Sequence, residues 1–263
     1  MLALSPPSLG RRTGSLVEGL VLSLMSRDMA REDIVFNRQA AAHYEDWYET
    51  PEGRRADVLE KSALHRLLEG FSGARSILEM GCGTGHFTRW LNEQGLAAVG
   101  LDRSAPMLAE AKALNGVPLA MGDAYRLPFA DSAFDLTALV TTLEFLKWPR
   151  EALTEGLRVA RRGLILGVLN RCSVLGLKRR LAGLFRSTVY DAARFYGVGE
   201  LKRLLQSVAG ERARIVWHTT LFPRGWPWPQ ARLPWGGFIA MALLPSEAAL
   251  MQQLPLETPS FHQ

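Results

Sequence analysis

Cysteine is scarce in this chain. Only Cys82 and Cys172 occur among 263 residues. Their separation matches neither a metal-ligand motif nor a redox-active pair, so the sequence predicts no structural metal. This sparse use of cysteine indicates a reducing, cytoplasmic setting.

Long apolar runs are also absent. No stretch reaches the ~18 uninterrupted apolar residues of a membrane-spanning helix. Arg11 and Arg12 precede an apolar segment, residues 16–24, which is similar to a signal peptide. Glu18 interrupts that segment and no small-residue cleavage site follows it, so we do not expect a cleaved signal.

The charge is mildly basic and is not gathered into one run. The net charge is +5 and the isoelectric point is near 9.5. This balance is typical of a basic enzyme, and it is also compatible with an acidic partner or an anionic membrane surface. The hydrophobic content of 48% is enough for a sizeable core.

A glycine-rich turn stands between a short apolar strand, predicted over residues 76–80, and a helix, predicted over residues 86–94. Gly81, Gly83 and Gly85 allow positive φ angles and let a ligand approach the main chain. Free N–H groups at the start of the helix add donors and partial positive charge. The turn therefore predicts a site for a small nucleotide-type ligand.

The spacing of the glycines separates two kinds of ligand. A dinucleotide site uses G-x-G-x-x-G, and here its third glycine is replaced by His86. Glu79 would repel a pyrophosphate but could help to hold a cationic amino group. Both features argue against a nicotinamide-dependent oxidoreductase.

Residues 79–85 complete the pattern Glu/Asp-x-Gly-x-Gly-x-Gly. With this motif the chain resembles the class I S-adenosylmethionine-dependent methyltransferases, and the resemblance covers about residues 33–245. It implies S-adenosylmethionine as the cofactor. It also implies that the cofactor contacts Glu79, Gly81, Cys82, Gly83 and Gly85.

Later motifs of the family follow in order. A second apolar strand, residues 97–101, ends in Asp102, at the roughly 20-residue spacing of a ribose-binding carboxylate. The resemblance places a further acid, Asp123, beside the adenine ring. The complete set of cofactor contacts that it implies downstream of the turn is Asp102, Arg103, Met107, Asp123, Ala124 and Thr141.

The predicted elements alternate. Strands over 97–101, 117–121 and 134–140 are interleaved with helices over 86–94 and 105–114, which is typical of a parallel sheet covered on both faces. Ligands of such sheets bind at the carboxyl ends of the strands. The resemblance implies an α/β, doubly wound, Rossmann-like, mostly parallel seven-stranded sheet. An antiparallel hairpin, residues 213–221 and 237–244, closes it.

We expect a poorly ordered extension over residues 1–30, a methyltransferase domain over 31–245 and a loose tail over 246–263. Within the domain, a basic helical insertion is predicted over 174–196. It would cover the acceptor pocket, or lie on an anionic membrane, where each cation adds about 1 kcal/mol. A Trp/Pro-rich loop, 222–236, would line the acceptor pocket, mediate homodimerisation or plug the end of the sheet.

An amphipathic helical pattern over residues 33–47 precedes the sheet. In related methyltransferases such a segment folds over the cofactor as a lid. The ring of Tyr44 could then face the sulfonium cation, an interaction worth about 0.5–2 kcal/mol. Core packing of an N-terminal helix is the alternative.

The expected reaction is in-line methyl transfer to a small molecule, with reacting atoms about 3–3.5 Å apart and no metal. The acceptor would be a thiol or other chalcogen, or a quinone- or lipid-like ring. Its proton would be removed by His43, His218 or Glu144, although a lone histidine more often packs, and Glu144 could serve only as a helix-start residue.

Two other functions are alternatives to this reaction. No appended module and no Asn/Asp-Pro-Pro-Tyr motif follows the fourth strand, so DNA is not expected as the substrate, and RNA is disfavoured. A cofactor-binding pseudoenzyme or partner subunit that uses the Trp-rich loop as an interface is the alternative from another class.

Overall fold

The computed structural model describes residues 35–114, 116–173, 193–226 and 229–244. The predicted N-terminal extension, the tail and residues 174–192 of the predicted insertion lie outside these ranges. The end of the insertion, residues 193–196, is not helical. It runs as a loop in which Tyr196 forms a β-bridge with Asn170.

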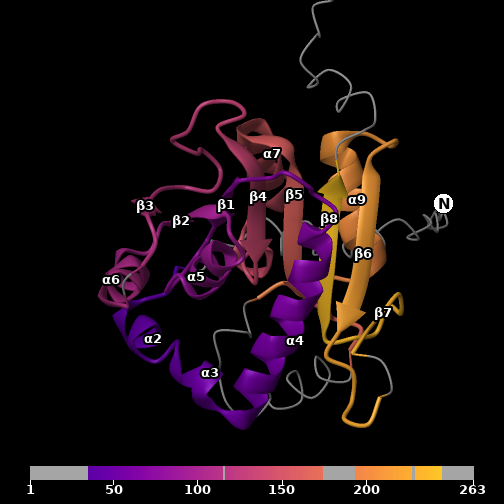
Figure 1. The fold of residues 1–263 in the computed structure, drawn as a ribbon, viewed down its shortest axis with the longest axis horizontal. Helices are drawn as coiled ribbons and strands as arrows, with labels where there is room; N and C mark the ends of the chain where they lie inside the picture. Colours follow the sequence, from indigo (N-terminus) through magenta and orange to yellow (C-terminus); the bar gives the residue numbers. More distant parts are fainter. Residues whose placement is uncertain (1–34, 115, 174–192, 227–228, 245–263) are drawn as a thin grey trace, which may run out of the picture. The chain divides into compact units, whose positions relative to one another are not determined.

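The described strands form a single sheet in the order β3-β2-β1-β4-β5-β8-β6-β7 (Figure 1). Their bounds are β1 Ser76–Met80, β2 Ala97–Asp102, β3 Leu119–Met121, β4 Phe134–Val140, β5 Ala160–Leu169, β6 Arg214–Thr220, β7 Gln230–Ala231 and β8 Phe238–Leu244. Strands β1 to β5 pair in parallel, whereas β8 is antiparallel to both β5 and β6. The α/β class and the antiparallel C-terminal hairpin are confirmed.

The predicted count of seven strands is wrong, because the described sheet has eight. The additional strand, β7, has two residues and pairs with Thr219 and Thr220 from within the Trp/Pro-rich loop. Two residues cannot show the alternation by which a strand is recognised, and the prolines around them argue against a strand.

The helices start at sequence signals that the structure explains. Thr50 caps α4 by accepting the N–H of Gly53, and Ser104 caps α6 by accepting the N–H of Met107. The bounds are α2 Arg38–Ala42, α3 Asp46–Glu49, α4 Pro51–Leu68, α5 His86–Glu93, α6 Ala105–Ala113, α7 Pro149–Val159 and α9 Val198–Ala209, with a 3₁₀ turn, η1, at Leu143–Phe145.

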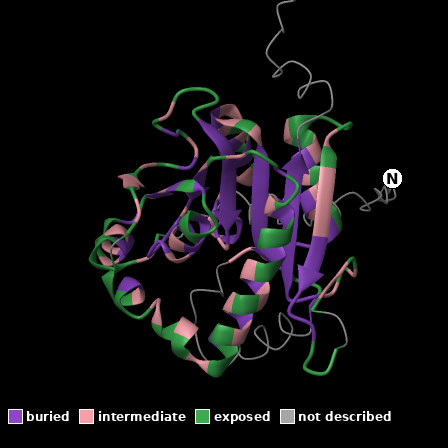
Figure 2. Ribbon diagram, in the orientation of Figure 1, coloured by how far each residue is buried: buried purple, intermediate pink, exposed green. Residues whose placement is uncertain are grey.

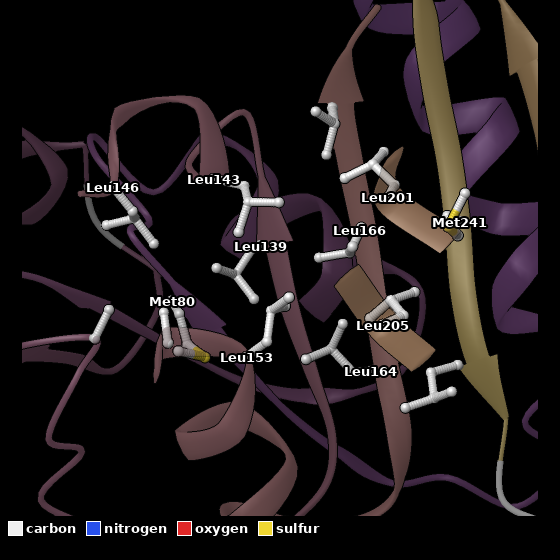
Figure 3. Close-up of a cluster of buried hydrophobic side chains, with 14 of the residues drawn as sticks. Met80, Leu139, Leu143, Leu146, Leu153, Leu164, Leu166, Leu201, Leu205 and Met241 are labelled. Atoms are coloured by element: carbon white, nitrogen blue, oxygen red, sulfur yellow. The ribbon is translucent and has the colours of Figure 1, made fainter. Parts of the chain in front are cut away.

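Helices cover both faces of the sheet. Helices α4 and α5 lie on one side of the sheet and α7 and α9 on the other (Figure 1). Their buried side chains belong to two different hydrophobic clusters. Strands β4 and β8 are buried along their whole length (Figure 2). On the α7 and α9 side, Leu153, Leu201 and Leu205 meet Leu139 and Leu166 of the strands (Figure 3). This double cover explains the uninterrupted apolar sequence of β8 and the mostly apolar sequence of β4, which contains only Asp135 and Thr137 as polar residues.

The carboxyl ends of β1, β2, β4 and β5 lead into the glycine turn, Ser104, η1 and Asn170 respectively. The short helices α2 and α3 lie along this edge (Figure 1). Across the described ranges, no helix has both the length and the apolar character that crossing a bilayer requires.

Candidate functional site

The glycine turn connects β1 to α5. Gly81, Gly83 and Gly85 have φ angles of +76°, +55° and +78°, which side chains rarely adopt. A Cβ on Gly81 would overlap Thr142, whose hydroxyl donates to the Gly81 carbonyl over 3.0 Å. A Cβ on Gly83 would meet nothing closer than the Cε of Met107 at 3.8 Å. Gly81 is therefore required for packing, whereas Gly83 leaves room for another molecule.

Asp102, at the end of β2, forms one unit with this turn. Its Oδ2 accepts the N–H of Gly83 over 2.8 Å, and its Oδ1 accepts the N–H of Ser104 over 2.7 Å. The carbonyl of Leu101 accepts the N–H groups of Gly81 and Cys82. Burial raises the pKa of Asp102, although the backbone donors oppose the rise. The turn thus fixes the position of the carboxylate predicted to bind ribose.

Glu79 lies beneath the turn and is almost completely buried. Its Oε2 accepts the hydroxyl of Thr88 on α5. Burial raises its pKa to about 8, and the charge of Asp102 adds to this rise. Glu79 therefore carries a proton at neutral pH that a nearby cation would tend to displace.

The remaining predicted cofactor contacts border the same edge. Met107 is buried beneath Gly83, and Cys82 is buried in the turn. Asp123 is exposed and accepts the N–H of Tyr125 over 2.9 Å. The preceding residue, Gly122, donates its N–H to the carbonyl of Asp102. Ala124 is buried, whereas Arg103 is exposed.

The end of β4 closes the other side of the turn. Thr141 has a φ of +49°, unusual for a β-branched residue, and its N–H donates to the carbonyl of Gly167 over 2.7 Å. Sequence analysis missed Thr142, which joins β4 to the turn, and also missed Ser104. For Ser104 the sequence carried one signal, its place before Ala105-Pro106 as a helix cap.

The segment before α4 covers this edge, but it is not one amphipathic helix. Residues 43–45 interrupt it between α2 and α3. The Phe36 carbonyl accepts the hydroxyl of Ser104 over 2.7 Å. The Phe36 ring stands edge-on to Tyr44, with centroids 6.0 Å apart, and to Phe145 of η1 at 5.2 Å. The segment therefore spans from the end of β2 to the turn that follows β4.

Glu144 lies in η1 between the ends of β4 and β5, and none of its surface is exposed. Its Oε1 accepts the N–H of Leu169 over 2.6 Å, while its Oε2 has no hydrogen-bond partner within the described part of the chain. Burial raises its pKa to about 7, against the effect of the N–H donor. Its carbonyl accepts the N–H of Arg194.

The two candidate histidines occupy other surroundings. The Nδ1 of His43 lies 3.0 Å from the Oδ2 of Asp46, and both side chains are more than 70% exposed. His218 is buried on β6, where its Nε2 lies 2.8 Å from the Ala63 carbonyl, and burial lowers its pKa. Strands β4, β5 and β8 separate β6 from β1 in the sheet, so His218 is not brought to the glycine turn.

No group of His, Cys, Asp and Glu side chains in the described ranges is arranged to hold a metal ion. The groups that the site offers to a ligand are instead the glycine turn, the buried carboxyl groups of Glu79 and Glu144, and the aromatic rings of Phe36 and Tyr44.

The residues at the carboxyl edge of the sheet are similar in sequence to those of known methyltransferases. The sequence model of a methyltransferase domain matches residues 78–167, which include the turn, Asp102 and β4. An uncharacterised protein of Mycobacterium tuberculosis is 34% identical over 167 residues, 63% of this chain and 56% of that protein. A demethylmenaquinone methyltransferase of Mycolicibacterium paratuberculosis is 39% identical over 94 residues, 36% of this chain and 40% of that enzyme. The chain thus spans about half the length of these curated relatives or less.

A solved structure agrees over a longer stretch. The crystal structure of a SAM-dependent methyltransferase from Thermotoga maritima superposes with a TM-score of 0.66 and 27% sequence identity. The match covers 79% of this chain and 96% of that protein. The structural agreement therefore extends well beyond the residues that the sequence model matches.

Proposed function

Because this chain belongs to the class I S-adenosylmethionine-dependent methyltransferases, we propose that it binds S-adenosylmethionine along the glycine turn and transfers the methyl group to a small-molecule acceptor. The observation that carries the proposal is the unit formed by Gly83 and Asp102. The N–H of Gly83 holds the carboxylate, while the absent Cβ leaves space beside it.

The residues present fit this cofactor. Asp102 would accept the ribose hydroxyls, Asp123 would lie beside the adenine, and Glu79 would favour the cationic amino group. The residues of the turn, with Arg103, Met107 and Ala124 beside it and Thr141 across from it, would complete the cradle. When bound, the cofactor supplies a methyl group already activated by the sulfonium.

The chain itself would align the reactants and exclude water. Tyr44, held by Phe36 above the edge, would cover the donor, and its ring would favour a cation. Among the candidate proton acceptors, Glu144 has the strongest support. It is buried beside the end of β4, one of its carboxyl oxygens has no partner among the described residues, and its pKa is raised to about 7. Both histidines are held by other groups.

For the acceptor we propose an apolar molecule with a ring. The similarity to a demethylmenaquinone methyltransferase supports a quinone-like ring. The loop after β6 adds a cluster in which the Phe222 ring centroid lies 5.7 Å from that of Trp226 and 4.8 Å from that of Trp235. A groove of about 400 Å³ lies between Phe222 and Trp226 of this cluster and Val58 and Leu59 of α4. A thiol or other chalcogen acceptor remains the alternative to be screened.

The experiment is calorimetric titration of S-adenosylmethionine into Gly83→Ala and Gly95→Ala. Both substitutions put an alanine at a positive φ, at +55° and +84°, and a new Cβ on Gly95 meets nothing within 4 Å. The strain is therefore similar, about 1–2 kcal/mol. We expect Gly83→Ala to weaken binding at least tenfold and Gly95→Ala to leave it unchanged. Equal affinities of two folded variants would contradict the assignment of the turn.

A further inference from the structure

His86, which occupies the position of the missing third glycine, is held by residues from two other elements. It is the first residue of α5. Its Nε2 lies 2.6 Å from the Oδ1 of Asp57 on α4, and its Nδ1 lies 3.5 Å from the Oε2 of Glu45, just before α3. The ring of Tyr48 on α3 stacks on the imidazole with centroids 3.7 Å apart and an angle of 8°. The side chain is 13% exposed.

These contacts continue a chain of rings that crosses the site. Phe145 meets Phe36, Phe36 meets Tyr44, Tyr44 meets Tyr48 at 6.2 Å, and Tyr48 stacks on His86. Phe145 follows β4 and His86 follows the glycine turn. The covering segment, residues 36–50, is therefore fixed at both ends of the edge where the donor would bind.

Glu45 adds a second connection between the covering segment and the turn. Its Oε1 accepts the hydroxyl of Thr84, which lies between Gly83 and Gly85. The Nη2 of Arg89 lies 3.5 Å from the same oxygen, and the Nη1 of Arg89 donates to the carbonyl of Thr84. One carboxylate of the covering segment thus contacts a residue of the turn, and its other oxygen faces the imidazole.

The two nitrogens of His86 both face carboxylate oxygens. A neutral imidazole can donate from only one of its nitrogens, so the observed arrangement is satisfied only by the imidazolium. The charged groups around it are Asp57 and Lys61 on α4, Glu45 and Arg89, and the buried Glu79 is a further titratable group nearby. Lys61 is itself paired with Asp57 over 2.9 Å.

We propose that His86 is a positioning residue. As an imidazolium between Asp57 and Glu45, it holds residues 36–50 closed over the glycine turn. The covering segment and the cofactor loop then form one unit. The inference rests on the proposed function for its consequence, which is tighter donor binding, but the closed arrangement itself belongs to the protein without donor.

The direction of the pH dependence follows from the surroundings. Burial lowers the pKa of His86, whereas the hydrogen bonds with Asp57 and Glu45 raise it. The contacts with the carboxylates together outweigh burial, so the pKa of His86 is raised above its usual value. A group whose pKa is raised in the closed state favours that state at low pH and loses this effect as the pH rises through the raised value. Residues 36–50 should therefore open more often in alkaline than in acidic solution.

Hydrogen exchange of the donor-free protein, read by mass spectrometry and corrected for intrinsic rates, tests the proposal. In the wild type we expect exchange in residues 36–50 to rise severalfold between about pH 6 and pH 8.5. His86→Gln should exchange at the fast level at both pH values, with β4 and α7 unchanged. The control His65→Gln, an exposed histidine on α4 bonded to Gln94, should behave as the wild type.

Donor titration at about pH 6 completes the test. His86→Gln should bind S-adenosylmethionine about tenfold more weakly than His65→Gln does. Wild-type exchange that is independent of pH, or fast exchange absent from His86→Gln, would overturn the inference. If no protein binds donor while the exchange pattern holds, the proposed function fails and the closure by His86 stands.

Discussion

Binding of the donor should release a proton from Glu79, and the number of protons released can be measured. Its pKa of about 8 in the donor-free protein means that about 90% of the molecules hold this proton at pH 7. A donor with an ammonium and a sulfonium beside Glu79 favours the carboxylate. If binding lowers the pKa to about 6, roughly 0.8 of a proton leaves for each donor bound.

The lowering of the Glu79 pKa on donor binding also determines how the affinity for the donor depends on pH. Below the pKa that Glu79 has in the donor-free protein, its proton must leave before the donor binds tightly. The affinity for the donor therefore rises with pH. Between about pH 6 and pH 7 the contribution of Glu79 tightens binding roughly fivefold. This range lies below the titration of the donor's own α-amino group, near pH 8.

The assay is calorimetric titration at pH 7 in buffers with different ionisation enthalpies, which gives the number of protons exchanged. Glu79→Gln has nearly the same shape but no titrating proton, so the difference between the two proteins isolates Glu79. The predicted difference is about 0.8 of a proton released. No difference, with both proteins binding donor, would refute the placement of Glu79 beside the cationic end of the donor.

Three further predictions follow from the carboxyl edge. Asp102→Ala should weaken donor binding by about 1.5–3 kcal/mol, because the ribose loses a charged hydrogen-bond acceptor, and an unchanged calorimetric dissociation constant would contradict this role. In the wild type, the free energy of unfolding should fall as the pH rises from about 5 to 7, because the Glu144 carboxyl, with its pKa of about 7, keeps a proton in the folded protein that the unfolded chain has lost. Glu144→Gln should flatten this fall. Urea titrations across this range that give the same pH dependence for both proteins would refute the prediction. Asn170→Ala should cost roughly 2–4 kcal/mol of stability, since its amide satisfies the carbonyls of Pro234 and Gly236, and a loss below about 1 kcal/mol by urea unfolding would argue against that role.

The sequence predicted the features that depend on neighbouring residues. The glycine turn, the strand ending in Asp102 and the fully buried β4 are predicted from local spacing and from a mostly apolar composition. The structure confirms these elements within a residue or two at their ends, as expected for a boundary defined by fraying hydrogen bonds.

The sequence could not predict features that depend on distant partners. Nothing near His86 indicates that Asp57 and Glu45 will flank its ring, because these residues come from elements placed by tertiary packing. The burial of Glu144 against Leu169 likewise requires β5 to lie beside β4. The break between α2 and α3 is likewise not encoded locally, because Phe36 of this segment contacts Ser104 after β2 and Phe145 after β4, and tertiary contacts of this kind override a helical pattern.

The most direct test of the central claim is calorimetric titration of the purified protein with S-adenosylmethionine, its demethylated product and NADH in parallel. The account predicts saturable binding of both sulfur nucleosides and none of NADH, because Gly83 and Asp102 form a cradle for the nucleoside, whereas His86 stands where a dinucleotide site has its third glycine. Binding of NADH, or of none of the three ligands by a folded protein, would contradict it.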